Sequence, residues 1–234
     1  MLDILRTLTL GATAGTLFAA ILSSLPIRLG PRLALGAGIG AWVSLVVAIT
    51  ASGVVRGSPL VLPIFFALPL VVVGLAATSA AWRSVIMAIP APLIIALSVM
   101  RVLGVFMLIA AVTGQMSGLF PYSAGIGDVI TGIFALPVAR IAAKNPRDIR
   151  VLQWNVFGAL DLIVAVTLGV MSVSGSPVQL IHAGVGSTAM TTLPWALIPL
   201  VLVPTYLIGH ALVFAHVRSA TTAVNHAQTN FAQA

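Results

Sequence analysis

The stretch RLALGAGIGAWVSLVVAITASGVVR, residues 32–56, places 23 uncharged and mostly apolar residues between two arginines. An α-helix crosses the hydrocarbon core of a bilayer with about 20 apolar residues. Uncharged stretches of similar length lie on both sides, with 21 residues between Arg6 and Arg28 and 26 between Arg56 and Arg83. The first 83 residues therefore predict three membrane-spanning helices.

The composition of the whole chain agrees with a membrane protein. Of its 234 residues, 60% are hydrophobic and 6% are charged, whereas soluble domains carry roughly 25% charged residues. This excludes a soluble globular protein. Polar and apolar residues show no sustained alternation, which argues against a transmembrane barrel. The absence of cysteine excludes disulfides, thiolate metal sites and iron–sulfur clusters.

An all-α transmembrane bundle with seven spans is predicted, because seven runs reach spanning length and Gly, Pro and Asn mark the joints. The predicted spans are 5–25, 33–55, 59–79, 92–115, 123–143, 151–172 and 192–217. Residues 84–91 precede the fourth span and include Pro90, so they are expected to form a short interfacial or re-entrant turn. The bundle forms one domain, 1–218, and the polar segment 219–234 is predicted to be a disordered cytoplasmic tail.

Basic residues predict the orientation, because short basic loops stay in the cytoplasm. The opposite side of the predicted bundle holds only Arg6 and Arg56. The N-terminus is therefore predicted outside and the C-terminus inside. The basic residues are spread over separate loops and form no continuous basic surface that could follow a phosphate backbone. The bilayer is therefore the expected partner, and nucleic acid is excluded. The connections after spans one, three and five and the C-terminal flank hold Arg28, Arg32, Arg83, Arg140, Lys144, Arg147, Arg150 and Arg218.

Three charged residues, Arg101, Asp128 and Asp161, fall inside the predicted spans. A charge in mid-bilayer is costly unless it is paired or faces water. At 1.5 Å per residue, Arg101 and Asp161 lie at similar depth, so they are expected to pair. One hypothesis is a polar cavity that binds a small polar or anionic ligand or relays protons. The alternative is a structural salt bridge, with Asp128 capping the start of the fifth span.

Further polar residues extend this candidate site. Gln115 shares a helix face with Arg101 and is expected to line the outer opening with Asp128. Trp154 and Asn155 lie near Asp161 on the sixth span. In the last span, Tyr206 lies one turn from His210, and a neighbouring hydroxyl of this kind is expected to satisfy the imidazole.

Several cofactor classes are excluded or disfavoured by the residues available. The only lysine, Lys144, falls in a predicted loop, so a retinal Schiff base is excluded. His210 is the only histidine well inside a predicted span, which disfavours haem within one chain. The acidic residues and histidines show no metal-ligand spacing. Neither a cofactor nor a metal is expected.

The motif Gly125-Ile126-Gly127-Asp128 resembles the Gly-x-Gly-Asp motif of presenilin-like and prepilin-peptidase-like intramembrane aspartyl proteases. The resemblance implies Asp161 as a second catalytic carboxylate. In those families the partner aspartate precedes the motif, whereas Asp161 follows it, and Arg101 would oppose proton sharing between the carboxylates. A protease is therefore a minor alternative, and no enzymatic activity is the main expectation.

A longer resemblance covers about 97–217, carried by the runs 97–104, 124–132, 154–161 and 198–204. These runs are similar to those of small, functionally uncharacterised bacterial multi-pass proteins. The resemblance implies a location in the bacterial inner membrane and supplies no activity. From the buried charges, the first hypothesis is a small permease or ligand-binding membrane protein. The alternative is a non-catalytic accessory or sensor subunit that binds a membrane protein partner or a second copy of itself.

Overall fold

The computed structural model describes residues 2–58 and 61–232, with side chains from 5–58 and 61–219. This part of the chain is all-α, as predicted, apart from one isolated bridge between Val173 and Gly186. The α-helices are α1 (Leu2–Ser24), α2 (Leu29–Ala51), α3 (Val54–Gly57), α4 (Val61–Ala76), α5 (Ala80–Met87), α6 (Ala91–Leu97), α7 (Val105–Val112), α8 (Leu119–Lys144), α9 (Ile149–Met171) and α10 (Val203–Ala232). Three other helical segments are η1 (Ser98–Gly104), η2 (Thr188–Thr191) and η3 (Ile198–Leu202).

Six segments of the described chain are long and apolar enough to cross a bilayer, and each overlaps a predicted span. They are Leu5–Ser24, Leu29–Ala51, Ala91–Val112, Leu119–Lys144, Ile149–Met171 and Ile198–Ser219. The third predicted span, 59–79, differs. There α4 has 16 residues, or about 24 Å of helix, which is shorter than the roughly 30 Å hydrocarbon core. It bends by 111° into α5, so the pair forms a broken span or a re-entrant segment.

The bend between α4 and α5 follows from the residues at the joint. The hydroxyl of Thr78 donates to the Leu75 carbonyl at 2.7 Å, and Ser79 is the N-cap residue of α5. Such short polar side chains compete with the helical backbone bonds. The turn therefore begins before the predicted 84–91, and α5 exposes Trp82 and Arg83 in the manner of an interfacial helix.

The fourth span is interrupted where the sequence predicted one helix over 92–115. The helix α6 begins directly after Pro90 and ends at Leu97. The 3₁₀ segment η1, which carries Arg101, follows it, and α7 then completes the span. The fifth span begins earlier than predicted, because Gly118 has a positive φ of 79° and lets α8 start at Leu119.

The last span begins at η3, a π-helical turn that contains Pro199, rather than at residue 192. It leads directly into α10, which continues through Ala232. Residues 219–232, predicted as part of a disordered tail, are therefore helical. Their polar composition does not prevent this, since Ala and Gln are good helix formers. Side chains from residue 220 onward lie outside the described residues, as do residues 233–234.

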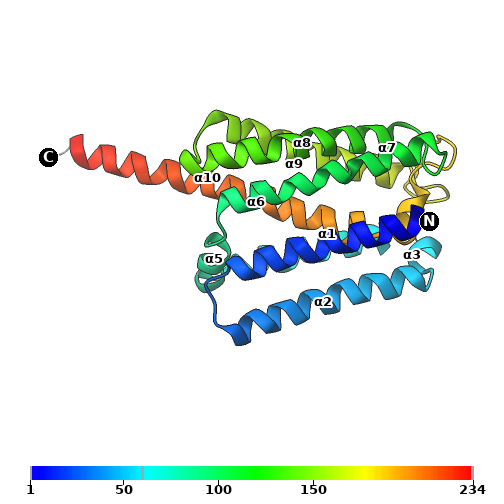
Figure 1. Ribbon diagram of the computed structural model, residues 1–234, viewed down its shortest axis with the longest axis horizontal. Coiled ribbons are helices and arrows are strands. Elements are labelled where there is room, and N and C mark those ends of the chain that lie inside the picture. Colours follow the sequence, from blue (N-terminus) through cyan, green and yellow to red (C-terminus); the bar gives the residue numbers. More distant parts are fainter. Residues whose placement is uncertain (1, 59–60, 233–234) are drawn as a thin grey trace.

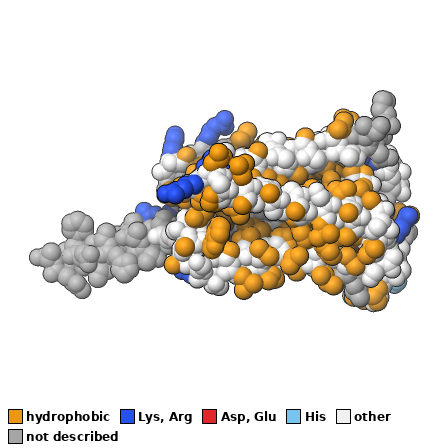
Figure 2. Space-filling model, turned by 90° about the horizontal axis from the view of Figure 1, so that it is seen from below, with side chains coloured by type: hydrophobic (Ala, Val, Ile, Leu, Met, Phe, Trp, Pro, Cys, Tyr) orange, Lys and Arg blue, Asp and Glu red, His pale blue; other side chains and the backbone are white. Residues whose placement is uncertain are grey.

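The helices form a bundle whose two ends differ. In Figure 1, α7, α8 and α9 lie together, α10 crosses beside them, and α1 and α2 lie on the other side. One end holds the N-terminus and α3, and the other holds α5 and the connection from α1 to α2. Figure 2 shows apolar side chains covering the flank between the ends, with most of the visible Lys and Arg side chains near the end that α10 leaves.

Candidate functional site

Arg101 lies at the centre of a cluster of charged and polar side chains inside the bundle. Its Nε donates to Asp128 Oδ1 at 2.7 Å, and its Nη2 donates to Asp161 Oδ2 at 2.6 Å. Its Nη1 donates to the Gly158 carbonyl at 3.2 Å and lies 3.0 Å from His210 Nε2. Arg101 is 2% exposed. One guanidinium on η1 thus joins α8, α9 and α10, and the predicted Arg101–Asp161 pair is confirmed.

The hydrogen bonds of His210 define its tautomer. A guanidinium can only donate, so His210 Nε2 accepts from Arg101 and the ring proton is on Nδ1. His210 Nδ1 lies 2.8 Å from Asn155 Oδ1, and Asn155 Nδ2 donates to the His210 carbonyl at 3.0 Å. The imidazole is therefore neutral and held on both nitrogens. We refer to Arg101, Asp128, Asn155, Asp161 and His210 as the Arg101 cluster.

Two aromatic side chains border the Arg101 cluster. Trp154 donates from Nε1 to the Thr131 carbonyl at 3.0 Å, and its ring centroid lies 5.3 Å from that of His210. The Arg101 Cζ lies 5.8 Å from the Tyr206 ring centroid, within range of a cation–π interaction. The buried Tyr206 hydroxyl has no hydrogen-bond partner among the described residues. The prediction that a neighbouring hydroxyl such as that of Tyr206 satisfies His210 is therefore wrong, because Asn155 and Arg101 do so.

Glycines make room for the cluster, a role that was not predicted from the sequence. A Cβ at Gly158 would lie 2.6 Å from His210 Cε1, and one at Gly104 would lie 2.5 Å from Asp128 Cβ. A Cβ at Gly127 would overlap the Asp161 carboxylate. His210, Asp128 and Asp161 therefore each face a residue without a side chain. Gly127 and Gly158 lie one and three residues from predicted site residues, a spacing that could have indicated their role.

The structure brings together seven of the eight predicted site residues and separates the eighth. The seven are Arg101, Asp128, Trp154, Asn155, Asp161, Tyr206 and His210. Gln115 lies elsewhere, where its Oε1 accepts from Arg6 Nη1 at 2.7 Å. It is displaced because the helix ends at Val112, so the face shared with Arg101 does not continue to residue 115.

The predicted capping role of Asp128 is wrong. The N-cap residue of α8 is Gly118, and Asp128 lies well inside that helix. Its carboxylate binds Arg101 instead of the orphan N–H groups of a helix end. The motif around Asp128 therefore belongs to the interior of a helix.

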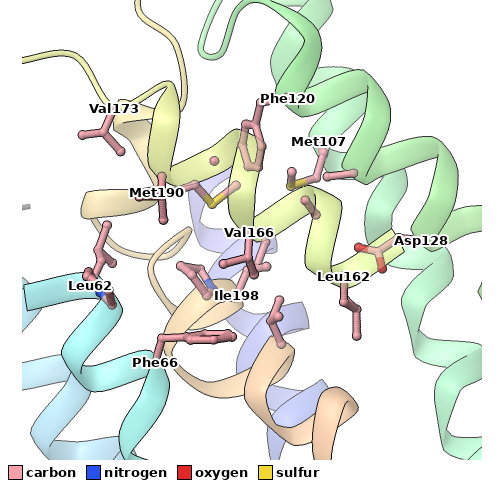
Figure 3. Close-up of a pocket in the computed structure, with 17 residues that line it drawn as sticks. Leu62, Phe66, Met107, Phe120, Asp128, Leu162, Val166, Val173, Met190 and Ile198 are labelled. Carbon is pink, nitrogen blue, oxygen red and sulfur yellow. The ribbon is translucent and has the colours of Figure 1, made fainter. Parts of the chain in front are cut away.

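Asp128 also borders a cavity of about 90 Å³. The other lining residues are apolar, and Figure 3 shows the Asp128 carboxylate beside Leu162, at the edge of a group of apolar side chains. The cavity is lined by Leu62 and Phe66 from α4 and by Ile198 from η3, as well as by residues of α7, α8 and α9. Its volume corresponds to about three water molecules. The Asp128 side chain is 19% exposed, compared with 8% for Asp161.

The arrangement limits the chemistry available at the cluster. An aspartyl protease needs two carboxylates that share a proton, whereas Asp128 and Asp161 each accept a hydrogen bond from a different nitrogen of Arg101. Within the described ranges, no group of three or more His, Asp or Glu side chains is placed to hold a metal ion. The geometry is that of an ion-pair network beside an apolar cavity.

Comparison with known proteins gives one match. A family model described as a domain of unknown function, DUF8737, matches residues 59–218. The matched part includes α4 to α9 and the whole Arg101 cluster, and it leaves out α1, α2 and α3. No curated protein and no solved structure matches the chain.

Proposed function

The chain belongs to the DUF8737 family, and we propose that it is a small permease or ligand-binding membrane protein for a short apolar molecule that carries a positive charge. The observation that carries this proposal is the position of Asp128. Its carboxylate is the only charged group lining an otherwise apolar cavity within the described bundle. Ligand sites of this kind combine apolar walls with a few polar groups that orient the ligand.

The charge balance of the cluster favours a cationic ligand over an anionic one. Arg101 supplies one positive charge against the carboxylates of Asp128 and Asp161, and His210 is neutral. With both carboxylates ionised, the cluster carries a net negative charge in a medium that penalises it. A proton or an ammonium group at Asp128 would remove that penalty. An anion, which the sequence suggested, would instead have to displace carboxylates from Arg101.

Interrupted helices around the site support a role in transport. Arg101 sits on the 3₁₀ segment η1, and the π-helical turn η3 lines the cavity. Non-α turns within helices often mark hinges or functional sites, and discontinuous spans surround the binding sites of many transporters. A ligand at Asp128 would contact η3 directly and would be linked to η1 through the bond between Asp128 and Arg101.

The membrane placement is part of the proposal. We infer a bacterial inner membrane, with the end that holds α5 facing the cytoplasm. Basic loop residues support this orientation, because Arg28 and Arg83 lie at that end whereas Arg56 lies at the other.

The test is a thermal-shift titration of the detergent-purified protein with butylammonium and, as the neutral control, 1-butanol. We expect butylammonium to raise the Tm of the wild type and of Asp148→Asn, which changes an exposed carboxylate, but not that of Asp128→Asn. Equal responses to both compounds, or an unchanged response in Asp128→Asn, would contradict the proposal.

The closed ion pairs of the cluster favour a second candidate function, that of a non-catalytic accessory subunit. Arg101 is almost fully buried and already bonded to α8, α9 and α10, as a purely structural group would be. In that case Asp128→Asn would lower the Tm, and neither compound would change it selectively. A partner protein or a second copy would then pack against the apolar flank of the bundle.

A further inference from the structure

A second cavity, of about 380 Å³, opens at the end of the bundle that holds α3. It shares no lining residue with the cavity beside Asp128. Its polar lining groups come from three parts of the chain: Arg56 of α3, Gln115 after α7, and Thr188 and Thr192 of the segment around η2. We refer to it as the Arg56 cavity.

The Arg56 guanidinium brings an unneutralised charge to this cavity. Arg56 is exposed, and its side chain has no hydrogen-bond or ion-pair partner in the described part of the chain. Among the residues that the structure describes, no carboxylate lines the cavity. Asp128 and Asp161 are bonded to Arg101, and Asp148 is bonded to Arg150. The cavity therefore has a positive group and, from the described carboxylates, no internal counter-ion.

The neighbouring polar groups are oriented as hydrogen-bond donors. Gln115 Oε1 accepts from Arg6 Nη1 at 2.7 Å, which leaves the Gln115 amide N–H groups to donate elsewhere. The Arg6 Cζ lies 4.9 Å from the ring centroid of Trp195, a residue of the cavity wall, so this contact helps to fix Arg6 behind Gln115. Thr188 Oγ1 accepts from the Ser174 backbone N–H at 3.1 Å, so its own hydroxyl proton is left to donate.

We propose that the Arg56 cavity binds a ligand with anionic oxygens, a carboxylate or a phosphate. Arg56 supplies the charge, and Gln115 and Thr188 supply neutral donors. A volume of about 380 Å³ exceeds that of a bare ion and falls within the range of small-molecule sites. Because the cavity lies at an end of the bundle, the anionic group can come from a soluble molecule or from a lipid headgroup.

The test measures the Tm of the purified full chain at constant ionic strength in two arms. The first arm titrates phosphate and succinate against chloride in detergent. The second compares vesicles of phosphatidylcholine with vesicles of equal parts phosphatidylcholine and phosphatidylglycerol. The variants are Arg56→Gln, Thr188→Val and, as the matched control, Arg147→Gln, which changes another exposed arginine outside the cavity.

We expect a Tm rise of about 2 °C or more in the wild type and Arg147→Gln, a smaller rise in Thr188→Val and none in Arg56→Gln. A rise in the first arm identifies a soluble anion, and a rise in the second arm alone identifies a lipid headgroup. The absence of a rise in both arms, or equal rises in Arg56→Gln and the wild type, overturns the proposal. Butylammonium binding at Asp128 does not involve Arg56, so the two proposals fail separately.

Discussion

The N-terminal pair α1–α2 and the C-terminal helices α6–α10 are held in the bundle by different interactions. The C-terminal helices meet at the Arg101 cluster, where hydrogen bonds join η1 to α8, α9 and α10. Glycines let these helices approach closely. Apart from Arg6, which is buried and donates to Gln115, the α1–α2 pair packs through apolar residues such as Leu17 and Val46 in a cluster that includes Leu200. Of α2, only Val46 and Thr50 are buried.

This difference matches the extent of the family match, which covers the C-terminal helices and leaves out α1–α2. Apolar contacts between a helix and its neighbours resemble its contacts with lipid, so they tolerate many substitutions. A buried guanidinium that is paired with two carboxylates and packed against glycines tolerates few substitutions. The position of α1–α2 is thus weakly specified, whereas that of α6–α10 is strongly specified.

Arg101→Ala should have the largest effect on stability. It leaves Asp128 and Asp161 buried without their partner, and breaking a buried ion pair costs about 3–5 kcal/mol. Thermal unfolding in detergent measures the loss, with Arg147→Ala as the control for an exposed arginine. If Arg101→Ala unfolds at the wild-type temperature, then the Arg101 cluster does not hold the C-terminal helices together.

One glycine substitution made in both regions should have opposite effects. In α8, Gly132→Ala would place a Cβ 2.5 Å from the Val102 backbone nitrogen, and such overpacking costs about 1–3 kcal/mol. In α2, no neighbouring atom lies within 4 Å of a Cβ at Gly38, so Gly38→Ala should range from neutral to about 1 kcal/mol stabilising. Both are read from thermal unfolding. Equal losses at the two positions would remove the contrast between the regions.

The sequence predicted the parts of the fold that depend on composition along the chain. Long uncharged runs identified six spans, and the charges within them identified the Arg101–Asp161 pair. The sequence did not predict the break at Thr78 or the 3₁₀ segment around Arg101, because local hydrogen bonding and packing decide where a helix is interrupted. The predicted position of Gln115 was wrong for the same reason, because the helix ends at Val112 and does not continue to residue 115.

The partners of the polar side chains were harder to predict than their clustering. Helical periodicity places Tyr206 and His210 on one face, but it does not reveal that Asn155 on α9 satisfies His210. It also does not show that Gly127 and Gly158 leave the space that the cluster occupies. Contacts between helices depend on their rotation and separation, which the pattern within one helix leaves open.

Tyr206→Phe should have a smaller effect than either preceding substitution in the core. The ring packs in the apolar cluster, and its hydroxyl has no partner among the described residues. Removing a buried, unsatisfied hydroxyl should leave stability unchanged or raise it by up to about 1 kcal/mol. The measurement is thermal unfolding, with His210→Phe as the control that does break hydrogen bonds. A large loss in Tyr206→Phe would show that the hydroxyl has a partner and would extend the strongly specified region.

Asp148→Asn tests whether burial, rather than charge pairing alone, accounts for the strength of the core. Asp148 caps α9, and its carboxylate accepts from the Arg150 backbone N–H at 2.9 Å and from the Arg150 side chain at 2.8 Å. These bonds lower the pKa of Asp148 to about 2. Because water screens this exposed pair, Asp148→Asn, which keeps a capping side chain, should lower the Tm at pH 7 by only about 1–2 °C.

The lowered pKa of Asp148 predicts how the Tm difference between wild type and Asp148→Asn depends on pH. A carboxyl whose pKa is lower in the folded state contributes stability above its unfolded pKa of about 4 and loses it as the pH falls toward 2. The Tm difference between wild type and Asp148→Asn should therefore be constant from pH 7 to pH 5 and shrink by pH 3. A difference as large as that of Arg101→Ala, or one that grows in acid, would mean that exposed ion pairs also hold the core. The difference between α1–α2 and α6–α10 would then depend on how many ion pairs each region contains and not on how deeply those pairs are buried.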